Sequence, residues 1–193
     1  MSGGGRVAPI IETVVTTLNP DGSVNCGAMG VEWGTERIVI KPYRGTRTLR
    51  NLRATGAAVV NLTDDILLFS QAALGDPHPP TCPAAGVEGA VLDDACSWRE
   101  VRVEAIDDSA QRARVSTVVV GRGTGREFLG LNRARDAVLE ASILASRVRM
   151  LPAEEIRADL GRLQVLVDKT GGPREREAMA YVIKALAGAC GCE

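Results

Sequence analysis

The hydrophobic pattern of this chain changes once, about two-thirds of the way along. Before that point apolar residues recur every second position, most clearly from Trp98 to Ile106, where Val101, Val103 and Ala105 share one side. After it, apolar and small residues recur at helical spacing from Ala134 to Val148. A period of two indicates strands and a period of 3.6 indicates helices, so the pattern predicts a β-rich region followed by helices.

Turn residues and helix-capping residues set the expected element boundaries. We expect strands at 10–18, 24–32, 37–40, 57–62, 98–106 and 112–120, and helices at 46–55, 64–73, 134–148, from 152 and from 173. The segment 75–89, rich in Pro, Gly and Ala, is expected to be a mobile surface loop. The prediction is a mainly β fold with α: a barrel or sandwich in residues 1–125, and a C-terminal helical appendage packed on it in residues 126–193.

Composition argues against two classes of partner. With 23 Lys and Arg against 24 Asp and Glu, and two each of Trp, Tyr and Phe, the chain offers neither the charge nor the stacking surface of a nucleic-acid-binding protein. No apolar run reaches membrane-spanning length, and the first residues contain no apolar signal region. Five cysteines, an odd number, suit a reducing compartment. A cytoplasmic location is therefore expected.

The segment 41–61 carries the clearest functional signal. Cations and hydroxyl groups gather between an expected strand and the start of an expected short helix: Lys41, Tyr43, Arg44, Thr46, Arg47 and Thr48. Backbone N–H groups and the positive end of the helix dipole attract anions at such a position. The segment therefore predicts a phosphate site. The alternative is that the cations are only solvated and that Thr46 is only an N-cap.

Other candidate motifs favour structural interpretations. The run Gly121–Gly125 lacks the spacing of a P-loop or a dinucleotide fingerprint and is typical of an ordinary connection. Cys190 and Cys192 supply two ligands where a structural zinc site needs four. His78 and Cys82 share a loop but have no further ligand nearby in the sequence. No metal site is expected.

Two segments resemble the FMN-binding split β-barrel, the fold of flavin reductases and pyridoxamine-phosphate-oxidase-like proteins. They are Asn25-Cys-Gly-Ala-Met-Gly-Val31, similar to a strand that passes beside the flavin ring, and the stretch Arg47 to Asn61. More narrowly, the chain resembles a split-barrel family of unassigned function from archaea and from bacteria with tetrahydromethanopterin-linked one-carbon metabolism. Glu12-Thr-Val14, Lys41-Pro-Tyr-Arg44 and the stretch Leu131 to Arg147 carry this resemblance.

The resemblance implies a Greek-key-like split barrel with a C-terminal helical subdomain, forming a homodimer with FMN at the subunit interface. Five residues would cradle the phosphate and ribityl chain: Lys41, Tyr43, Arg44, Thr46 and Thr48. Four would line the flavin ring through backbone and side chain: Asn25, Met29, Gly30 and Val31. Asn51 would brace the loop through the short helix. A strand rich in Gly and Ala suits this role because its backbone can approach a ring closely.

The function implied by the resemblance is that of a flavin-dependent oxidoreductase of the flavin reductase type, with NADH or NADPH as the electron donor. No catalytic residue is named, because hydride transfer through a flavin uses the chemistry of the cofactor. Two alternatives stay open. One is a flavin-binding accessory protein without turnover in methanopterin-linked metabolism, and the other is a protein that binds a deazaflavin instead.

Overall fold

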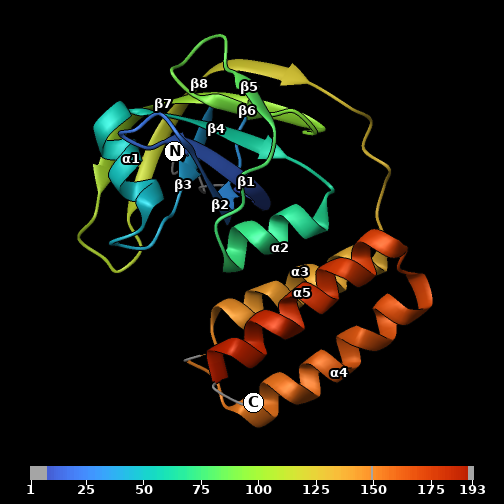
Figure 1. Cartoon of the computed structure of the whole chain (residues 1–193). Coiled ribbons are helices and arrows are strands. Elements are labelled where there is room, and N and C mark those ends of the chain that lie inside the picture. Colours follow the sequence, from blue (N-terminus) through green and yellow to red (C-terminus); the bar gives the residue numbers. More distant parts are fainter. Residues whose placement is uncertain (1–7, 149, 191–193) are drawn as a thin grey trace, which may run out of the picture. The chain divides into compact units, whose positions relative to one another are not determined.

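The chain forms two compact units in a computed structural model that describes residues 8–148 and 150–190 (Figure 1). The barrel unit comprises Met1–Leu62 and Pro80–Gly125. The helical unit comprises the remaining residues, 63–79 and 126–193.

This division differs from the predicted single boundary after residue 125 in one segment. Residues 63–79 group with the C-terminal helices and interrupt the barrel sequence. The reason is the apolar character of the helix α2 (Ile66–Leu74), in which Leu67, Leu68 and Phe69 are all buried. This helix packs against two of the C-terminal helices.

Six strands of the barrel unit close into a barrel in the order β1-β2-β3-β8-β7-β4, and β4 pairs back with β1. The barrel unit consists of β1 (Ile10–Leu18), β2 (Val24–Glu32), β3 (Arg37–Ile40), α1 (Arg47–Thr55), β4 (Ala57–Leu62), β5 (Thr81–Pro83), β6 (Ala90–Leu92), β7 (Ser97–Asp107) and β8 (Arg114–Thr124). All pairings of the barrel strands are antiparallel. The strand order departs from the sequence order because β3 pairs with β8 and not with β4. The closed sheet confirms the predicted barrel fold.

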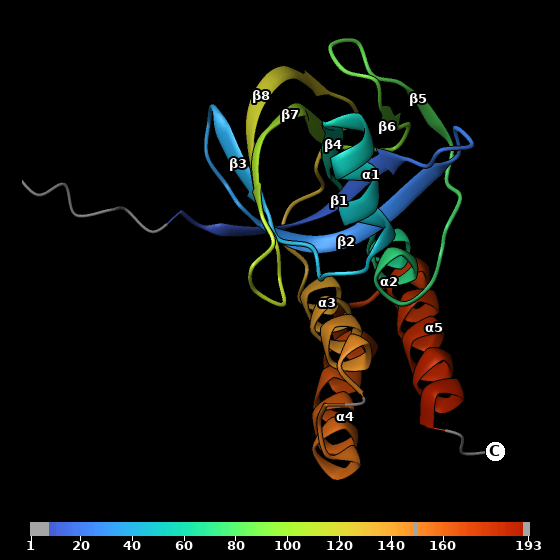
Figure 2. The ribbon, with the colours of Figure 1, turned by 90° about the vertical axis from the view of Figure 1, so that its left-hand side faces the viewer.

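The helix α1 contributes to the core of this barrel. Leu49 and Leu52 are each 1% exposed and join a cluster with inward-facing valine and isoleucine side chains of the strands. Gly56 ends the helix in the left-handed conformation, with φ of 66°, which a glycine adopts without strain. Figure 2 shows α1 lying across β1 and β2, which are among the strands it contacts. The core thereby fixes where the N-terminal end of α1 points.

The segment predicted to be a loop, 75–89, contains a strand. Its residues 81–83 form β5, which pairs with β6 in a separate two-stranded sheet. Side chains from the barrel fasten this sheet: the hydroxyl of Thr16 donates to the carbonyl of Ala90, and Asn61 Oδ1 accepts from the N–H of Leu92 at 3.1 Å. Both side chains are completely buried. The sheet is therefore part of the barrel unit.

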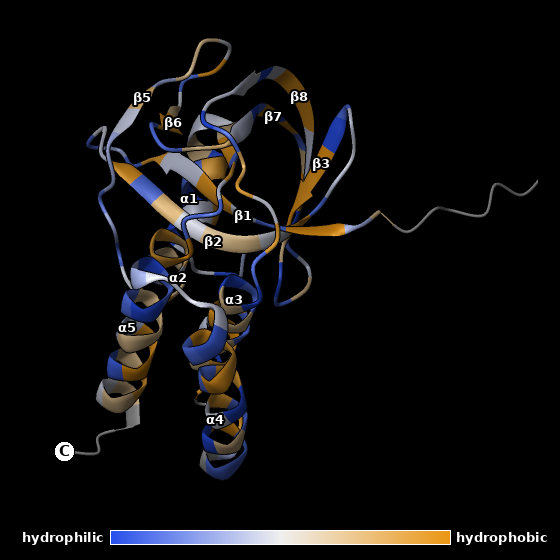
Figure 3. Cartoon of the chain, turned by 90° about the vertical axis from the view of Figure 1, so that its right-hand side faces the viewer, coloured by the Kyte–Doolittle hydropathy of each residue, from blue (hydrophilic) through white to orange (hydrophobic). Residues whose placement is uncertain are grey.

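The helical unit contains α2 together with α3 (Arg133–Ser146), α4 (Ala153–Thr170) and α5 (Pro173–Cys190). Small residues on α3, among them Ala134, Ala137 and Ala141, are almost completely buried and allow close packing. Hydrophilic and hydrophobic residues alternate along α4 and α5, as in amphipathic helices (Figure 3). The predicted C-terminal helical subdomain is confirmed. Within the described part of the chain, no helix has both the length and the apolar character needed to cross a bilayer.

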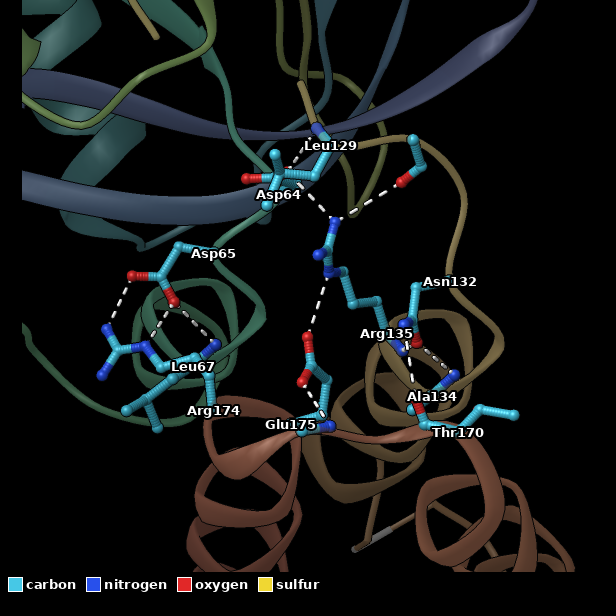
Figure 4. Close-up of polar contacts among 12 residues, drawn as sticks. Asp64, Asp65, Leu67, Leu129, Asn132, Ala134, Arg135, Thr170, Arg174 and Glu175 are labelled. Atoms are coloured by element: carbon cyan, nitrogen blue, oxygen red, sulfur yellow. Dashed lines mark hydrogen bonds and ion pairs between the residues drawn. The ribbon is translucent and has the colours of Figure 1, made fainter. Parts of the chain in front are cut away.

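Buried ion pairs connect the start of α2 with α3 and α5 inside the helical unit (Figure 4). Arg135 lies between Asp64 and Glu175, and its guanidinium reaches both carboxylates. Arg174 binds the carboxylate of Asp65, which also caps α2. The two ion pairs of Arg135 are largely buried, and such pairs depend strongly on the presence of every partner.

Candidate functional site

The loop between β3 and α1, residues 41–46, is held by backbone hydrogen bonds to the segment that precedes β8. The N–H of Ala113 donates to the carbonyl of Pro42 at 2.9 Å, and the N–H of Arg44 donates to Gln111 at 3.0 Å. An isolated bridge pairs Tyr43 with Arg112, which lies between Gln111 and Ala113 in the chain. The loop therefore continues the β3–β8 pairing and has a defined conformation.

Thr46 acts as the N-cap of α1. Its hydroxyl oxygen accepts the N–H of Leu49 at 3.4 Å and its hydroxyl group donates to the carbonyl of Tyr43 at 2.8 Å. Gly45 has φ of 83°, which lets the chain turn sharply into the helix. The first turn of α1 has no acidic residue, so the positive end of its dipole is not compensated there. This end of the helix can attract an anion.

Two exposed guanidinium groups belong to the same loop region. Arg44 is exposed, and Arg112 is exposed with its guanidinium 4.7 Å from the centroid of the Tyr43 ring. Tyr43 itself is 41% exposed. Arg112 could not be predicted as part of this region from the sequence, because only the pairing of the loop with the residues before β8 brings this side chain to Tyr43.

Lys41 is engaged with an acidic residue. Its ammonium group pairs with Glu32 at the end of β2, and the same carboxylate receives two bonds from Arg114 at 2.9 and 2.8 Å. The hydrogen bonds from Arg114 and then from Lys41 lower the pKa of Glu32 from 4.5 to about 2. Glu32 is therefore ionised throughout the physiological range and balances part of the positive charge of this region.

Three of the predicted site residues join a buried polar network. Asn25 donates to the hydroxyl oxygens of Thr17 and Thr48, both at 3.1 Å, and Asn51 donates to Thr17 at 3.1 Å and to Asn19 at 2.9 Å. Asn25, Thr48 and Asn51 are each at most 5% exposed. The network fastens α1 to the β1–β2 hairpin, and the side chain of Thr48 is directed at β2.

The predicted ring-lining residues of β2 do not share one face. Side chains alternate along a strand, so Asn25, Met29 and Val31 lie on one side and Gly30 on the other. Val31 is completely buried in the barrel core, and Met29 packs against that core. A Cβ at Gly30 would lie 2.6 Å from the side chain of Ile10. The side chain of Val31 therefore belongs to the core and is not available to a ligand.

The glycine run 121–125 lies mostly in β8 and serves packing. A Cβ at Gly123 would lie 2.1 Å from the Trp98 ring, and one at Gly121 would lie 3.0 Å from the carboxyl carbon of Glu100. Both side chains belong to β7, directly opposite these glycines in the register. Among the described residues, no group of three His, Cys, Asp or Glu side chains could hold a metal ion. Cys192 lies outside the described residues.

Two family models cover most of the chain. The model described as the N-terminal domain of a protein of unknown function, DUF447, matches residues 11–126, and the model described as DUF447 matches residues 132–184. The chain belongs to the DUF447 family. The junction between the two models lies close to the end of β8, where the barrel unit ends.

Solved structures share the fold of this DUF447 chain. An FMN-bound DUF447 protein from Methanosarcina mazei has a TM-score of 0.81 and 23% identity, covering 92% of this chain and 95% of that one. Nitrilotriacetate monooxygenase component B from Bacillus cereus has a TM-score of 0.53 and 16% identity, with coverages of 68% and 79%. An FMN-binding protein from Thermus thermophilus, with bound 1-cyclohex-2-enone, has 0.50 and 13%, with coverages of 64% and 75%. These similarities confirm the predicted split-barrel fold.

Proposed function

We propose that the barrel unit binds FMN, with the phosphate at the loop 41–46 and the N-terminal end of α1. The observation that carries this proposal is that a DUF447 protein from Methanosarcina mazei, with the same fold over 92% of this chain, is FMN-bound. The donor set of this chain fits a phosphate. Exposed guanidinium groups gather at an uncompensated helix N-terminus, which is the chemistry that phosphates require.

The residues of the loop differ in the roles that they can take. Arg44 presents an exposed guanidinium, which can make charge-assisted bonds to a phosphate, and the hydroxyl of Tyr43 can add a neutral one. Thr46 uses its hydroxyl to cap α1 and so fixes the direction of the first-turn N–H groups. In this proposal Arg112 is a further cation beside the phosphate, held in place by its stacking on the Tyr43 ring.

The buried residues are assigned to support and to contacts with the ring. Asn25, Thr48 and Asn51 hold α1 against the β1–β2 hairpin through their hydrogen bonds, and in this way they place the phosphate loop. The backbone of β2 around Met29, Gly30 and Val31 is the proposed neighbour of the flavin ring. When bound, FMN would supply the hydride and electron transfer, and the protein would bind and orient it.

We further propose an oxidoreductase of the flavin reductase type that takes electrons from NADH or NADPH. A homodimer with FMN at the subunit interface and a cytoplasmic location complete this proposal. The similarity in fold to component B of nitrilotriacetate monooxygenase supports a redox role. The setting in methanopterin-linked one-carbon metabolism stays a prediction from the sequence resemblance.

The visible absorption spectrum of the purified protein, before and after adding FMN and removing the excess, tests the binding. Retention of about one flavin per chain would support the proposal, and a colourless protein that does not retain FMN would overturn it. Oxidation of NADH or NADPH by the FMN-loaded protein then tests the enzymatic part, and loaded protein without turnover refutes that part alone. A mass in solution equal to one chain would refute the dimer.

A further inference from the structure

Glu32 connects the two strand ends that border the proposed phosphate loop. Lys41 directly follows β3 and Arg114 begins β8, and both cations bind the carboxylate of Glu32 at the end of β2. Between these two cations lie the loop 41–46 and the segment that pairs with it. The side chain of Glu32 is 20% exposed, less than that of either cation. The carboxylate of Glu32 thus links the ends of β2, β3 and β8 at the base of the loop.

The position of Lys41 argues against a direct contact with phosphate. Its ammonium group already has an anionic partner, and a move towards a ligand would leave Glu32 with Arg114 alone. Arg44 differs, because its side chain is exposed and it lies two residues before Thr46, the N-cap of α1. Lys41 therefore has a structural partner, whereas Arg44 is placed to receive a ligand.

We propose that Glu32 is a positioning residue for flavin phosphate binding, and that Lys41 acts through Glu32 and not as a phosphate ligand. This inference rests on the proposed FMN function. It contradicts what simple charge counting would predict, since removing an acidic group beside an anion site should strengthen anion binding. If Glu32 instead holds the loop in place, its removal weakens that binding.

The test compares the affinities of Glu32→Gln, Lys41→Met and the double variant for FMN and for riboflavin, which lacks the phosphate. Each single variant should raise the Kd for FMN about three- to tenfold, the effect of a misplaced charge-assisted bond, and change the Kd for riboflavin less than about twofold. The double variant should be no weaker than either single variant, because both changes break the same contact. Flavin fluorescence quenching measures all of these constants.

Two other results would overturn the inference. If Lys41 is a phosphate ligand, Glu32→Gln leaves FMN affinity unchanged or raises it while Lys41→Met lowers it. Additive losses in the double variant would likewise show that the two residues act separately. If the wild-type protein binds neither flavin, the proposed function itself fails, and the two failures can be told apart.

Two controls complete this experiment. Glu104→Gln removes an equal charge from a comparable pair, in which Glu104 accepts two bonds from Arg37 at 2.9 and 3.2 Å, and it should leave both affinities unchanged. Arg44→Ala should weaken FMN but not riboflavin, which shows that the assay detects a phosphate ligand. The fluorescence of Trp33 and Trp98, both in the barrel unit, shows whether each variant is folded.

Discussion

Arg135 offers a sharp test of how the helical unit is stabilised. Its Nη1 lies 3.0 Å from a carboxylate oxygen of Asp64, and its Nε lies 3.1 Å from one of Glu175 (Figure 4). The side chains of Arg135, Asp64 and Glu175 are 19%, 5% and 10% exposed. One guanidinium therefore binds two buried carboxylates on different segments, of which Asp64 has Arg126 as a second cationic partner. We expect the replacement of Arg135 by methionine to destabilise the unit.

The expected loss is about 2–4 kcal/mol of unfolding free energy. Removing one partner of a buried ion pair costs about 3–5 kcal/mol, because a buried charge is left without compensation. The loss here is smaller because both carboxylates keep other donors. Glu175 accepts the N–H of Gly172 at 2.9 Å. Asp64 keeps its ion pair with Arg126 and accepts the N–H of Leu129 at 3.1 Å.

The pH dependence gives this prediction a second observable. Burial raises the pKa of Glu175, but the hydrogen bond from Arg135 and backbone N–H groups outweigh it, so the pKa lies below its ordinary value of 4.5. A lowered pKa contributes stability above the unfolded value, which is lost as the pH falls through the folded value. The hydrogen bond from Arg135 is the largest of the effects that lower this pKa, so the pKa of Glu175 rises when Arg135 is removed. The deficit of Arg135→Met should therefore be largest near pH 7 and narrow below about pH 5.

Urea unfolding followed by circular dichroism at about 222 nm, near pH 7 and again below about pH 5, measures the loss of unfolding free energy in Arg135→Met. The double variant Arg135→Met/Glu175→Gln should recover part of the loss, since it removes the uncompensated carboxylate. Arg162→Met is the matched control, because Arg162 is 76% exposed and pairs with Asp159 on the surface, where a pair contributes less than about 1 kcal/mol. A deficit below about 1 kcal/mol for Arg135→Met, or one independent of pH, would refute the reasoning.

Three further predictions concern the barrel unit. Arg44→Ala should weaken FMN binding by roughly 1.5–3 kcal/mol in titration calorimetry, the contribution of a charge-assisted bond, and unchanged affinity would contradict the phosphate assignment. Glu100 is 4% exposed and accepts the N–H of Gly86, which holds the segment around Gly86 to β7. Glu100→Gln should therefore speed the hydrogen exchange of the Gly86 amide, and an exchange rate equal to that of the wild type would contradict this role of Glu100. Gly27→Val places a Cβ 2.8 Å from the hydroxyl oxygen of Thr48 and should lower the free energy of unfolding, measured by thermal unfolding, by about 1–3 kcal/mol. A Tm equal to that of the wild type would show that α1 can shift without loss of stability.

The barrel strands could be predicted because their signals are local. The run Asn19-Pro-Asp-Gly22 marks a turn, and β1 and β2 begin and end at the predicted residues on both sides of it. The short strand β5 could not be predicted, since three residues in a segment rich in Pro and Gly show no period. The grouping of α2 with the C-terminal helices was also missed. It depends on packing against helices that begin more than 50 residues later.

The candidate site was predictable in its residue types but not in its contacts. Thr46 caps α1, and Tyr43 and Arg44 lie exposed in the loop before this helix. That these residue types bind a phosphate stays a prediction. No local pattern shows that Lys41 pairs with Glu32, or that Arg114, 82 residues from Glu32 in the sequence, shares that carboxylate. The barrel topology alone brings these strands together. A cationic motif thus predicts that an anion binds in this region, but it does not predict which of the cations contacts that anion.

The glycines lead to a similar conclusion about the flavin ring. A glycine in a strand indicates close approach of another group, and on β2 the family resemblance implies that this group is the flavin ring. At Gly27 the approaching atom is the hydroxyl oxygen of Thr48, and at Gly123 it is the Trp98 ring. Both glycines are therefore explained by the protein's own side chains. The charges of the loop and the N-terminal end of α1 support the phosphate end of the proposed site. The ring end is supported only by the backbone of β2. Mutations at Arg44 therefore test the proposal more directly than mutations at Gly30.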